Sequence, residues 1–312
     1  MRHLLLAAVA ASLALPVTAQ EPAPIPSPGE IAAAAPVSDW IAIAPSDLLV
    51  MDLAPDTKGK PRRVVIQLMP APFSQRWIGN IRKLAAAHWW DGTSVNRVQD
   101  NYVVQWGDAT EKKALPEGLV MVAESEYVVP EWCGGHVCPP LSPVGSPSNA
   151  LERVYGGTGG FNFGWPVATD GRNLWPTHCY GIVGVGRNLS PDTGTGAELY
   201  TVIGHAPRHL DQNIALVGRV ISGIEHLSSL PRGTGALGFY ETEAERVPIA
   251  SVRIATELPE AEQPHFEYLS TESDSFARYA DARANRRDPF FIKPAGGADI
   301  CNIPVPVRAV VK

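Results

Sequence analysis

Three side chains that can bind a peptide group occur close together in the first half of the chain. Arg97, Tyr102 and Gln105 are spaced five and three residues apart, on two short β-branched runs. A guanidinium beside an aromatic ring and an amide suits an uncharged peptide group, because arginine offers several donors in a fixed geometry. The spacing therefore indicates a peptide-binding site.

A β-hairpin is the element that would position these side chains. Residues 99–101, with the sequence Gln-Asp-Asn, separate the two runs, and this pattern is typical of a hairpin. If Val95 and Val98 lie on one strand and residues 102–106 on the next, Arg97 and Gln105 share one face of the sheet, since side chains alternate with period two.

The hairpin and its flanks resemble the core motif of cyclophilin-type peptidyl-prolyl cis-trans isomerases, which runs close to D-G-T-x-F-H-R-V-x-x-x-F-x-x-Q-x-G-D. The matching residues are Asp91, Gly92, Thr93, Arg97, Val98, Gln105, Gly107 and Asp108, and Tyr102 replaces a phenylalanine. Residues 181–220 resemble the later strands of the family, and residues 63–87 resemble its opening strand and first helix. The similarity covers residues 40–258, apart from a long insertion.

The resemblance implies a mostly β fold, a cyclophilin-like closed barrel of about eight antiparallel strands capped by two helices. The insertion, residues 109–180, is expected outside the barrel near the mouth of the site. The expected divisions of the chain are a signal peptide at 1–19, a Pro/Ala-rich leader at 20–38, a cyclophilin-like domain at 39–258 and a C-terminal extension at 259–312.

The resemblance also implies rotation about X-Pro peptide bonds, with no metal, nucleotide or other cofactor. The barrier to this rotation is about 20 kcal/mol. At the twisted transition state the proline nitrogen regains a localised lone pair, so a donor that reaches it stabilises that state selectively. Arg97 is the expected catalytic donor, and Gln105 would hold the peptide backbone. The pocket for the proline ring would be lined by Tyr102, Val103, Tyr200 and Leu210.

Several positions depart from the family pattern. Arg187 lies where the family usually has alanine-asparagine-alanine, and Glu198 lies in a segment that is usually serine-glutamine-phenylalanine-phenylalanine. Ile214 replaces a common histidine, and His209 replaces an aromatic residue. These departures keep a second hypothesis open, a catalytically weak cyclophilin-like module that binds proline-containing peptides or envelope proteins.

Composition narrows the classes of function. The chain has 312 residues with 45% apolar content, enough for a substantial core in one large domain or two. Its 26 basic and 32 acidic residues give a net charge of −6, which argues against nucleic acid as a partner, because phosphate binding usually requires a basic face. Motifs of the common hydrolases and nucleotide-binding enzymes are missing. A hydrolase built on the insertion stays a third hypothesis, and the oligomeric state stays open.

The first residues predict export. Arg2 precedes an apolar run over residues 4–15, and Val17 and Ala19 are small residues of the kind that a signal peptidase recognises. The run is too short to span a bilayer, which takes roughly 20 apolar residues. We therefore expect a periplasmic or secreted protein that begins near Gln20, with no integral membrane segment after cleavage. The leader that follows has the composition of a tether or a disordered segment.

Four cysteines are consistent with an oxidising compartment. Cys133 and Cys138 flank a short glycine-containing loop and are expected to form a disulfide, and Cys179 and Cys301 are candidates for another. Four cysteines allow three connectivities, so the sequence leaves the pairing open. The alternative is a zinc site, because the gap between the first two cysteines lies within metal-ligand spacing. Its ligands would be Cys133, Cys138, Cys179 and either His136 or His178.

Periodicity predicts the supporting elements. Residues 73–87 place Trp77, Ile81 and Leu84 at helical spacing, which indicates an amphipathic helix. Other expected elements are strands at 63–68, 214–221 and 249–255, a short helix at 223–229, and a C-terminal helix over 264–287 that lies on the barrel.

Overall fold

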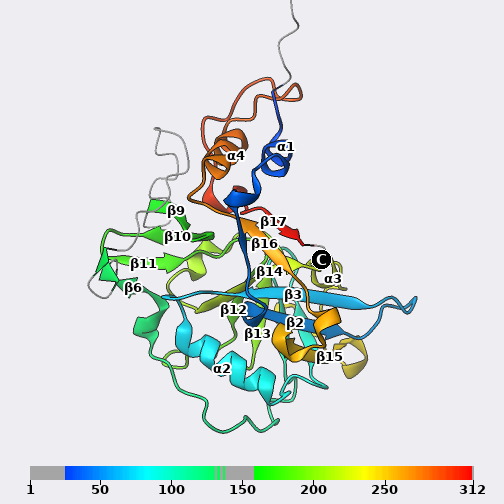
Figure 1. Cartoon of the computed structure of the whole chain (residues 1–312). Helices are drawn as coiled ribbons and strands as arrows, with labels where there is room; N and C mark the ends of the chain where they lie inside the picture. The colour runs from blue at the N-terminus through cyan, green and yellow to red at the C-terminus, as the bar shows by residue number, and fades with distance from the viewer. Residues whose placement is uncertain (1–24, 131, 134–135, 138–157, 311–312) are drawn as a thin grey trace, which may run out of the picture.

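The centre of the molecule is a closed barrel of eight antiparallel strands (Figure 1). The computed structural model describes residues 25–130, 132–133, 136–137 and 158–310. The barrel strands are β2 (Leu48–Leu53), β3 (Arg62–Leu68), β4 (Ser94–Val98), β5 (Val103–Gly107), β12 (Ile182–Val185), β13 (Leu199–Val202), β14 (Leu216–Ser222) and β15 (Val247–Ile254). Their order around the barrel is β12-β13-β5-β4-β15-β2-β3-β14. The closed eight-stranded barrel predicted from the sequence is confirmed.

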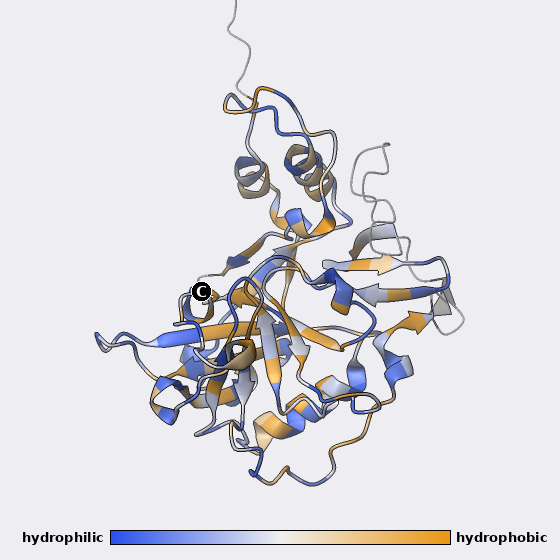
Figure 2. Ribbon diagram, turned by 180° about the vertical axis from the view of Figure 1, so that it is seen from behind, coloured by the Kyte–Doolittle hydropathy of each residue, from blue (hydrophilic) through white to orange (hydrophobic). Residues whose placement is uncertain are grey.

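Some barrel strands are buried on both faces because other segments cover them. In β2, Leu49 and Met51 belong to the main core, while Leu48 and Val50 belong to a second apolar cluster that includes Tyr268 of the C-terminal extension. The two sets alternate along the strand, as the period of two requires. The continuous apolar run of β2 therefore reflects cover on its outer face, and Figure 2 shows such apolar stretches in the barrel strands.

Two helices accompany the barrel, as the family resemblance implied. α2 (Gln75–Ala86) buries Trp77, Ile81 and Leu84, the three residues that periodicity placed on its inner face. The indole Nε1 of Trp77 donates to the carbonyl of Gly194 at 3.0 Å, which ties the helix to the loop between β12 and β13. α3 (Glu225–Ser228) is a single turn directly after β14.

The insertion forms a sheet of its own beside the barrel (Figure 1). Its four antiparallel strands, in spatial order, are β6 (Val129–Pro130), β11 (Asn173–Pro176), β10 (Trp165–Thr169) and β9 (Thr158–Asn162). A two-stranded sheet, β7 (Trp132–Cys133) with β8 (His136–Val137), lies between β6 and β9 in the chain. Trp165 and Trp175 are fully buried, so the insertion has packed apolar side chains of its own.

The segments before and after the barrel are joined in a third sheet. β16 (Phe266–Leu269) pairs with β1 (Trp40–Ala42) on one side and with β17 (Val307–Ala309) on the other. The helices α1 (Pro28–Ala33) and α4 (Asp274–Ala284) lie beside each other above this sheet in Figure 1. The N-terminal and C-terminal segments therefore form one structural unit.

Two expectations for these segments were wrong. Residues 28–33 of the expected leader form α1, because Ser27 and Glu30 make a capping box and Pro28 is placed in the first turn. Residues 266–269 of the expected C-terminal helix form a strand. The remaining helix, α4, packs on α1 and on the insertion, where the Phe276 ring lies 5.0 Å from that of Phe161, and not over the barrel.

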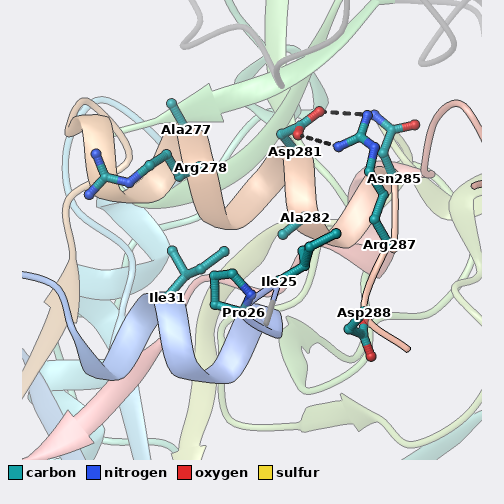
Figure 3. A pocket seen from close by; sticks show the side chains of 10 residues that line it. All are labelled: Ile25, Pro26, Ile31, Ala277, Arg278, Asp281, Ala282, Asn285, Arg287 and Asp288. Carbon is teal, nitrogen blue, oxygen red and sulfur yellow. Dashed lines mark hydrogen bonds and ion pairs between the residues drawn. The ribbon is translucent and has the colours of Figure 1, made fainter. Parts of the chain in front are cut away.

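A pocket of about 370 Å³ lies between α1 and α4. Figure 3 shows Ile31 of α1 and Ala277 of α4 on its two sides. Asp281 of α4 pairs with Arg287 at 3.2 Å and accepts a hydrogen bond from Asn285 at 2.9 Å. This pocket belongs to the terminal unit, and none of its lining residues is one of the predicted site residues.

One disulfide joins the end of the insertion to the C-terminal extension. Cys179 and Cys301 are bonded, with their Cα atoms 5.0 Å apart, which confirms the second expected pair. Cys138 of the other expected pair, Cys133 and Cys138, lies outside the described residues, so that pairing stays a prediction. Within the described part of the chain, no helix has both the length and the apolar character needed to span a bilayer.

Candidate active site

The predicted hairpin is present and brings its side chains together as expected. β4 and β5 pair antiparallel, with Arg97 directly opposite Gln105. An irregularity in the register lies between Val95 and Arg97. The Arg97 guanidinium donates to Gln105 Oε1 at 3.2 Å. The two residues therefore act on one face of the hairpin as a bonded pair.

Several contacts fix the Arg97 guanidinium. Its Nε donates to the carbonyl of Leu237 at 2.8 Å, and its other end donates to Gln99. The guanidinium carbon lies 5.3 Å from the ring centre of Phe239 and 5.8 Å from that of Tyr102. Partial burial lowers the pKa of Arg97, and no carboxylate of the described residues forms an ion pair with it. Its charge is available to a bound peptide.

A pocket of about 110 Å³ opens beside this guanidinium. It is lined by Arg97, Tyr102, Val103, Gln105, Val185, Gly186, Arg187, Tyr200, Leu210 and Ile214. All six residues that were predicted as catalytic or substrate-binding are among them. Val103 and Tyr200 pack together with Val202 in an apolar cluster, so the interior of the pocket is apolar and its edge carries a cation.

The departures from the family pattern reshape this pocket. Ile214 packs against the apolar cluster, and His209 lies parallel to the Tyr102 ring with 6.4 Å between ring centres. Arg187 uses its guanidinium on backbone carbonyls, with bonds of 3.0 and 3.1 Å to Asn213. The Arg187 guanidinium is therefore held by backbone carbonyls alone, whereas two of the three bonds of Arg97 go to glutamine side chains of the hairpin.

Glu198 lies behind Gln105. A Cβ atom on Gly107 would lie 1.9 Å from Glu198 Oε1, and one on Gly186 would lie 2.8 Å from Glu198 Cβ, so two glycines make room for this side chain. Burial raises the pKa of its carboxyl group to about 7, although hydrogen bonds from Asn96 and Gln105 lower it. Among the described residues its Oε2 has no hydrogen-bond partner.

The structure adds residues to the site that sequence reasoning missed. Tyr200 is hydrogen-bonded through its hydroxyl to His178 of the insertion, which is bonded in turn to Asp211. Only Asp211 has a weak signal in the sequence, because it follows the predicted pocket residue Leu210. His178 appeared only as a possible zinc ligand, and that role is wrong for it and for Cys179. Both ring nitrogens of His178 have protein partners, and the Cys179 sulfur is in the disulfide.

Comparisons with known proteins point to one family. A family model described as cyclophilin type peptidyl-prolyl cis-trans isomerase/CLD matches residues 56–256. The cyclophilin AquaCyp293 from Hirschia baltica has a similar structure, with 22% identity and a TM-score of 0.66 over 87% of this chain and 94% of that one. A Cryptosporidium parvum cyclophilin-type isomerase, solved with the dipeptide Ala-Pro, shows 12% identity and a TM-score of 0.37 over 66% of this chain and 98% of that one. A search of curated proteins found no match.

The family model spans more than half of the chain and includes the whole hairpin. The eight-stranded barrel and the likeness to a solved cyclophilin agree with it. The chain belongs to the cyclophilin-type peptidyl-prolyl cis-trans isomerase family.

Proposed function

We propose that this protein isomerises X-Pro bonds in exported proteins and thereby assists their folding. The observation that carries the proposal is the Arg97–Gln105 pair at the edge of an apolar pocket of about 110 Å³. An apolar pocket suits the proline ring, and the pair at its edge suits the peptide group that precedes the ring.

The reaction needs positioning and one donor. When the proline ring lies against Tyr200 and Val103, the peptide bond lies beside Arg97. Rotation of that bond removes the amide resonance and leaves a lone pair on the proline nitrogen. A donated N–H from Arg97 stabilises the twisted state more than the planar one, and this difference is what raises the rate. No proton is transferred and no covalent bond forms.

Export is supported by two features of the chain. The leader has a basic residue, Arg2, before an apolar run and the small residue Ala19 at the expected cleavage position. The disulfide between Cys179 and Cys301 fits an oxidising compartment. Intact-mass measurement on protein from the native host should give a mature chain that begins near Gln20. A retained Arg2 would contradict export through this leader.

The isomerase proposal is tested by turnover. We expect short peptides with one X-Pro bond to interconvert faster with the protein, in an NMR exchange experiment or a protease-coupled assay. The second hypothesis, a proline-peptide binding module, is favoured by the altered pocket wall at Arg187 and Ile214. Measurable peptide binding without turnover on any X-Pro peptide would support the module and contradict the enzyme.

A further inference from the structure

A chain of buried polar groups lies behind the pocket floor. The Tyr200 hydroxyl is 2.8 Å from His178 Nε2, and His178 Nδ1 is 2.8 Å from Asp211 Oδ1. The other carboxylate oxygen of Asp211 accepts from Arg208 Nε at 2.5 Å. The relative exposure is 0% for His178, 5% for Tyr200 and 6% each for Asp211 and Arg208. Four polar side chains are thus buried together. Their removal from water costs free energy, which their mutual hydrogen bonds offset.

Chemistry fixes the direction of these bonds. Asp211 also accepts from the His178 backbone N–H at 2.9 Å, so with Arg208 it is held as a carboxylate that can only accept. Burial lowers the pKa of His178, which keeps the imidazole neutral with a single N–H. That N–H lies on Nδ1 and donates to Asp211. Nε2 is then an acceptor, and it takes the Tyr200 O–H, whose pKa burial raises well above its ordinary value.

The barrel backbone leaves space for this hydroxyl. Gly184 of β12 pairs directly with Tyr200 of β13. A Cβ atom at Gly184 would lie only 2.3 Å from the Tyr200 hydroxyl oxygen, closer than any side chain could pack. The His178 and Tyr200 rings are also nearly parallel, with 6° between their planes. The absence of a side chain at Gly184 therefore leaves room for the phenol, and its hydrogen bond to His178 of the insertion holds it there.

The position of the Tyr200 ring matters because it lines the pocket that receives the proline ring. An aromatic ring held only by apolar contacts can shift, whereas one anchored through its hydroxyl keeps a single position. The side chains of a preformed pocket lose little conformational entropy when peptide binds, and the peptide therefore binds more tightly.

We propose that His178 and Asp211, supported by Arg208, are positioning residues of the isomerase site, which anchor the Tyr200 hydroxyl and so set the shape of the proline pocket. The proposal rests on the proposed function, and it gives the insertion a role in substrate binding. His178 lies next to Cys179, and the sulfur of Cys301 lies 3.8 Å from the His178 carbonyl oxygen. The disulfide therefore holds the backbone that carries His178.

The test uses variants that remove one contact each. Tyr200→Phe keeps the ring and deletes the hydroxyl. His178→Asn keeps a donor for Asp211 but has no group that reaches Tyr200. The matched control is Tyr279→Phe, because Tyr279 is equally buried at 6% exposure and donates through its hydroxyl to one carbonyl, that of Pro304, in the terminal unit. Isomerase kinetics and the Kd of a short Ala-Pro peptide are measured for each.

For Tyr200→Phe and His178→Asn we expect KM and Kd to rise roughly 3- to 30-fold with kcat changed less than twofold, as for the loss of one buried hydrogen bond that acts on binding alone. The double variant should match the single variants, because both remove the same bond. Tyr279→Phe should bind peptide like the wild type. Should His178→Asn fail to fold, Tyr200→Phe carries the test alone.

A spectroscopic measurement checks the bond direction. In ¹⁵N spectra recorded near neutral pH, His178 should be neutral with the proton on Nδ1, because burial lowers its pKa, and its Nε2 resonance should move in Tyr200→Phe. Peptide affinity of Tyr200→Phe within twofold of the wild type would overturn the proposal, even if thermal stability fell. If the wild type bound peptide without turnover, the isomerase proposal would fail. The comparison of peptide Kd between Tyr200→Phe and the wild type would still test whether His178 and Asp211 position Tyr200.

Discussion

The two walls of the proposed proline pocket are built in different ways. On the hairpin wall, Arg97, Tyr102 and Gln105 lie within one hairpin, and the Arg97 guanidinium contacts both of the other side chains. On the opposite wall, Tyr200 depends on His178 from the insertion and on Asp211 from the segment before β14. In the proposed function, the hairpin wall supplies the charge that acts on the peptide bond, and the opposite wall sets the shape of the ring pocket. The proposed catalytic side chains are then close together in the sequence, whereas the proposed ring pocket is assembled from distant segments.

The largest effect is expected on the hairpin wall. Arg97→Ala should lower kcat/KM for X-Pro isomerisation by about one to three orders of magnitude, the size expected for one preorganised charged donor. Arg97→Lys should restore little, because an ammonium group cannot reproduce the planar fork. Peptide Kd should change much less than the rate. Arg76→Ala, which removes an exposed arginine paired with Glu126, is the charge-matched control and should keep full activity.

A second prediction concerns Glu198, which lies behind the hairpin wall. The pKa of its carboxyl is raised from 4.5 to about 7 in the folded protein. Between these values the folded state keeps a proton that the unfolded state has lost, so the free energy of unfolding falls as pH rises from about 4.5 to 7. The loss is about 3 kcal/mol at most.

The neutral variant Glu198→Gln isolates this effect. Urea unfolding should show the two proteins nearly equal in stability at pH 4.5, with the variant more stable at pH 8. Equal stability of the two proteins at both pH values would mean that the pKa of Glu198 is the same in the folded and unfolded states.

A smaller effect is expected from Leu210→Ala on the pocket lining. Leu210 is half-buried and lines the pocket, so its truncation removes apolar contact with the proline ring. We expect peptide Kd to rise roughly three- to tenfold with kcat little changed. Titration calorimetry gives the affinity, and Leu189→Ala, at a position that is 88% exposed, is the matched control. A drop in kcat without a change in Kd would place Leu210 in the transition-state contacts.

The smallest effect is expected for the other cation at the pocket. Arg187→Ala should change kcat/KM by less than about twofold, because its guanidinium is used on the carbonyls of Asn213 and Asn188 in an exposed position. Side-by-side kinetics with Arg97→Ala measure the contrast. A tenfold loss would show that the second cation also acts on the substrate.

The same contrast between walls explains what could be predicted from the sequence. The hairpin wall was predictable because its turn, its period-two pattern and its three side chains lie within a few residues of one another. The barrel was predictable because the hairpin motif resembles that of the cyclophilin-type family, and the resemblance implies a closed barrel. The role of His178 could not be predicted, because nothing near it in the sequence shows that it contacts Tyr200, which lies on β13 beyond β12. For the same reason the sequence could not show that His178 and Cys179 have partners other than a zinc ion.

The terminal unit shows a different limit. The proline and alanine content of residues 28–33 predicts a tether, but Ser27 and Glu30 cap a helix that packs against α4. Residues 266–269 lie in a charged, helix-like segment and form a strand because β1 and β17 pair with them. For the strand, partners far along the chain decided the local structure, and composition carried no information about them. For the helix the cap is local, and composition missed it because it ignores the order of residues.

The disulfide has a consequence for how the chain is completed. Cys179 and Cys301 are 122 residues apart, and β12, β13, β14 and β15, half of the barrel, lie between them. Closing a covalent loop of that length removes chain entropy from the unfolded state worth about 5 kcal/mol. During synthesis Cys179 appears before those four strands and Cys301 after them. The bond can therefore form only after every barrel strand has been synthesised, and it then links the segment before β12 to the segment after β15.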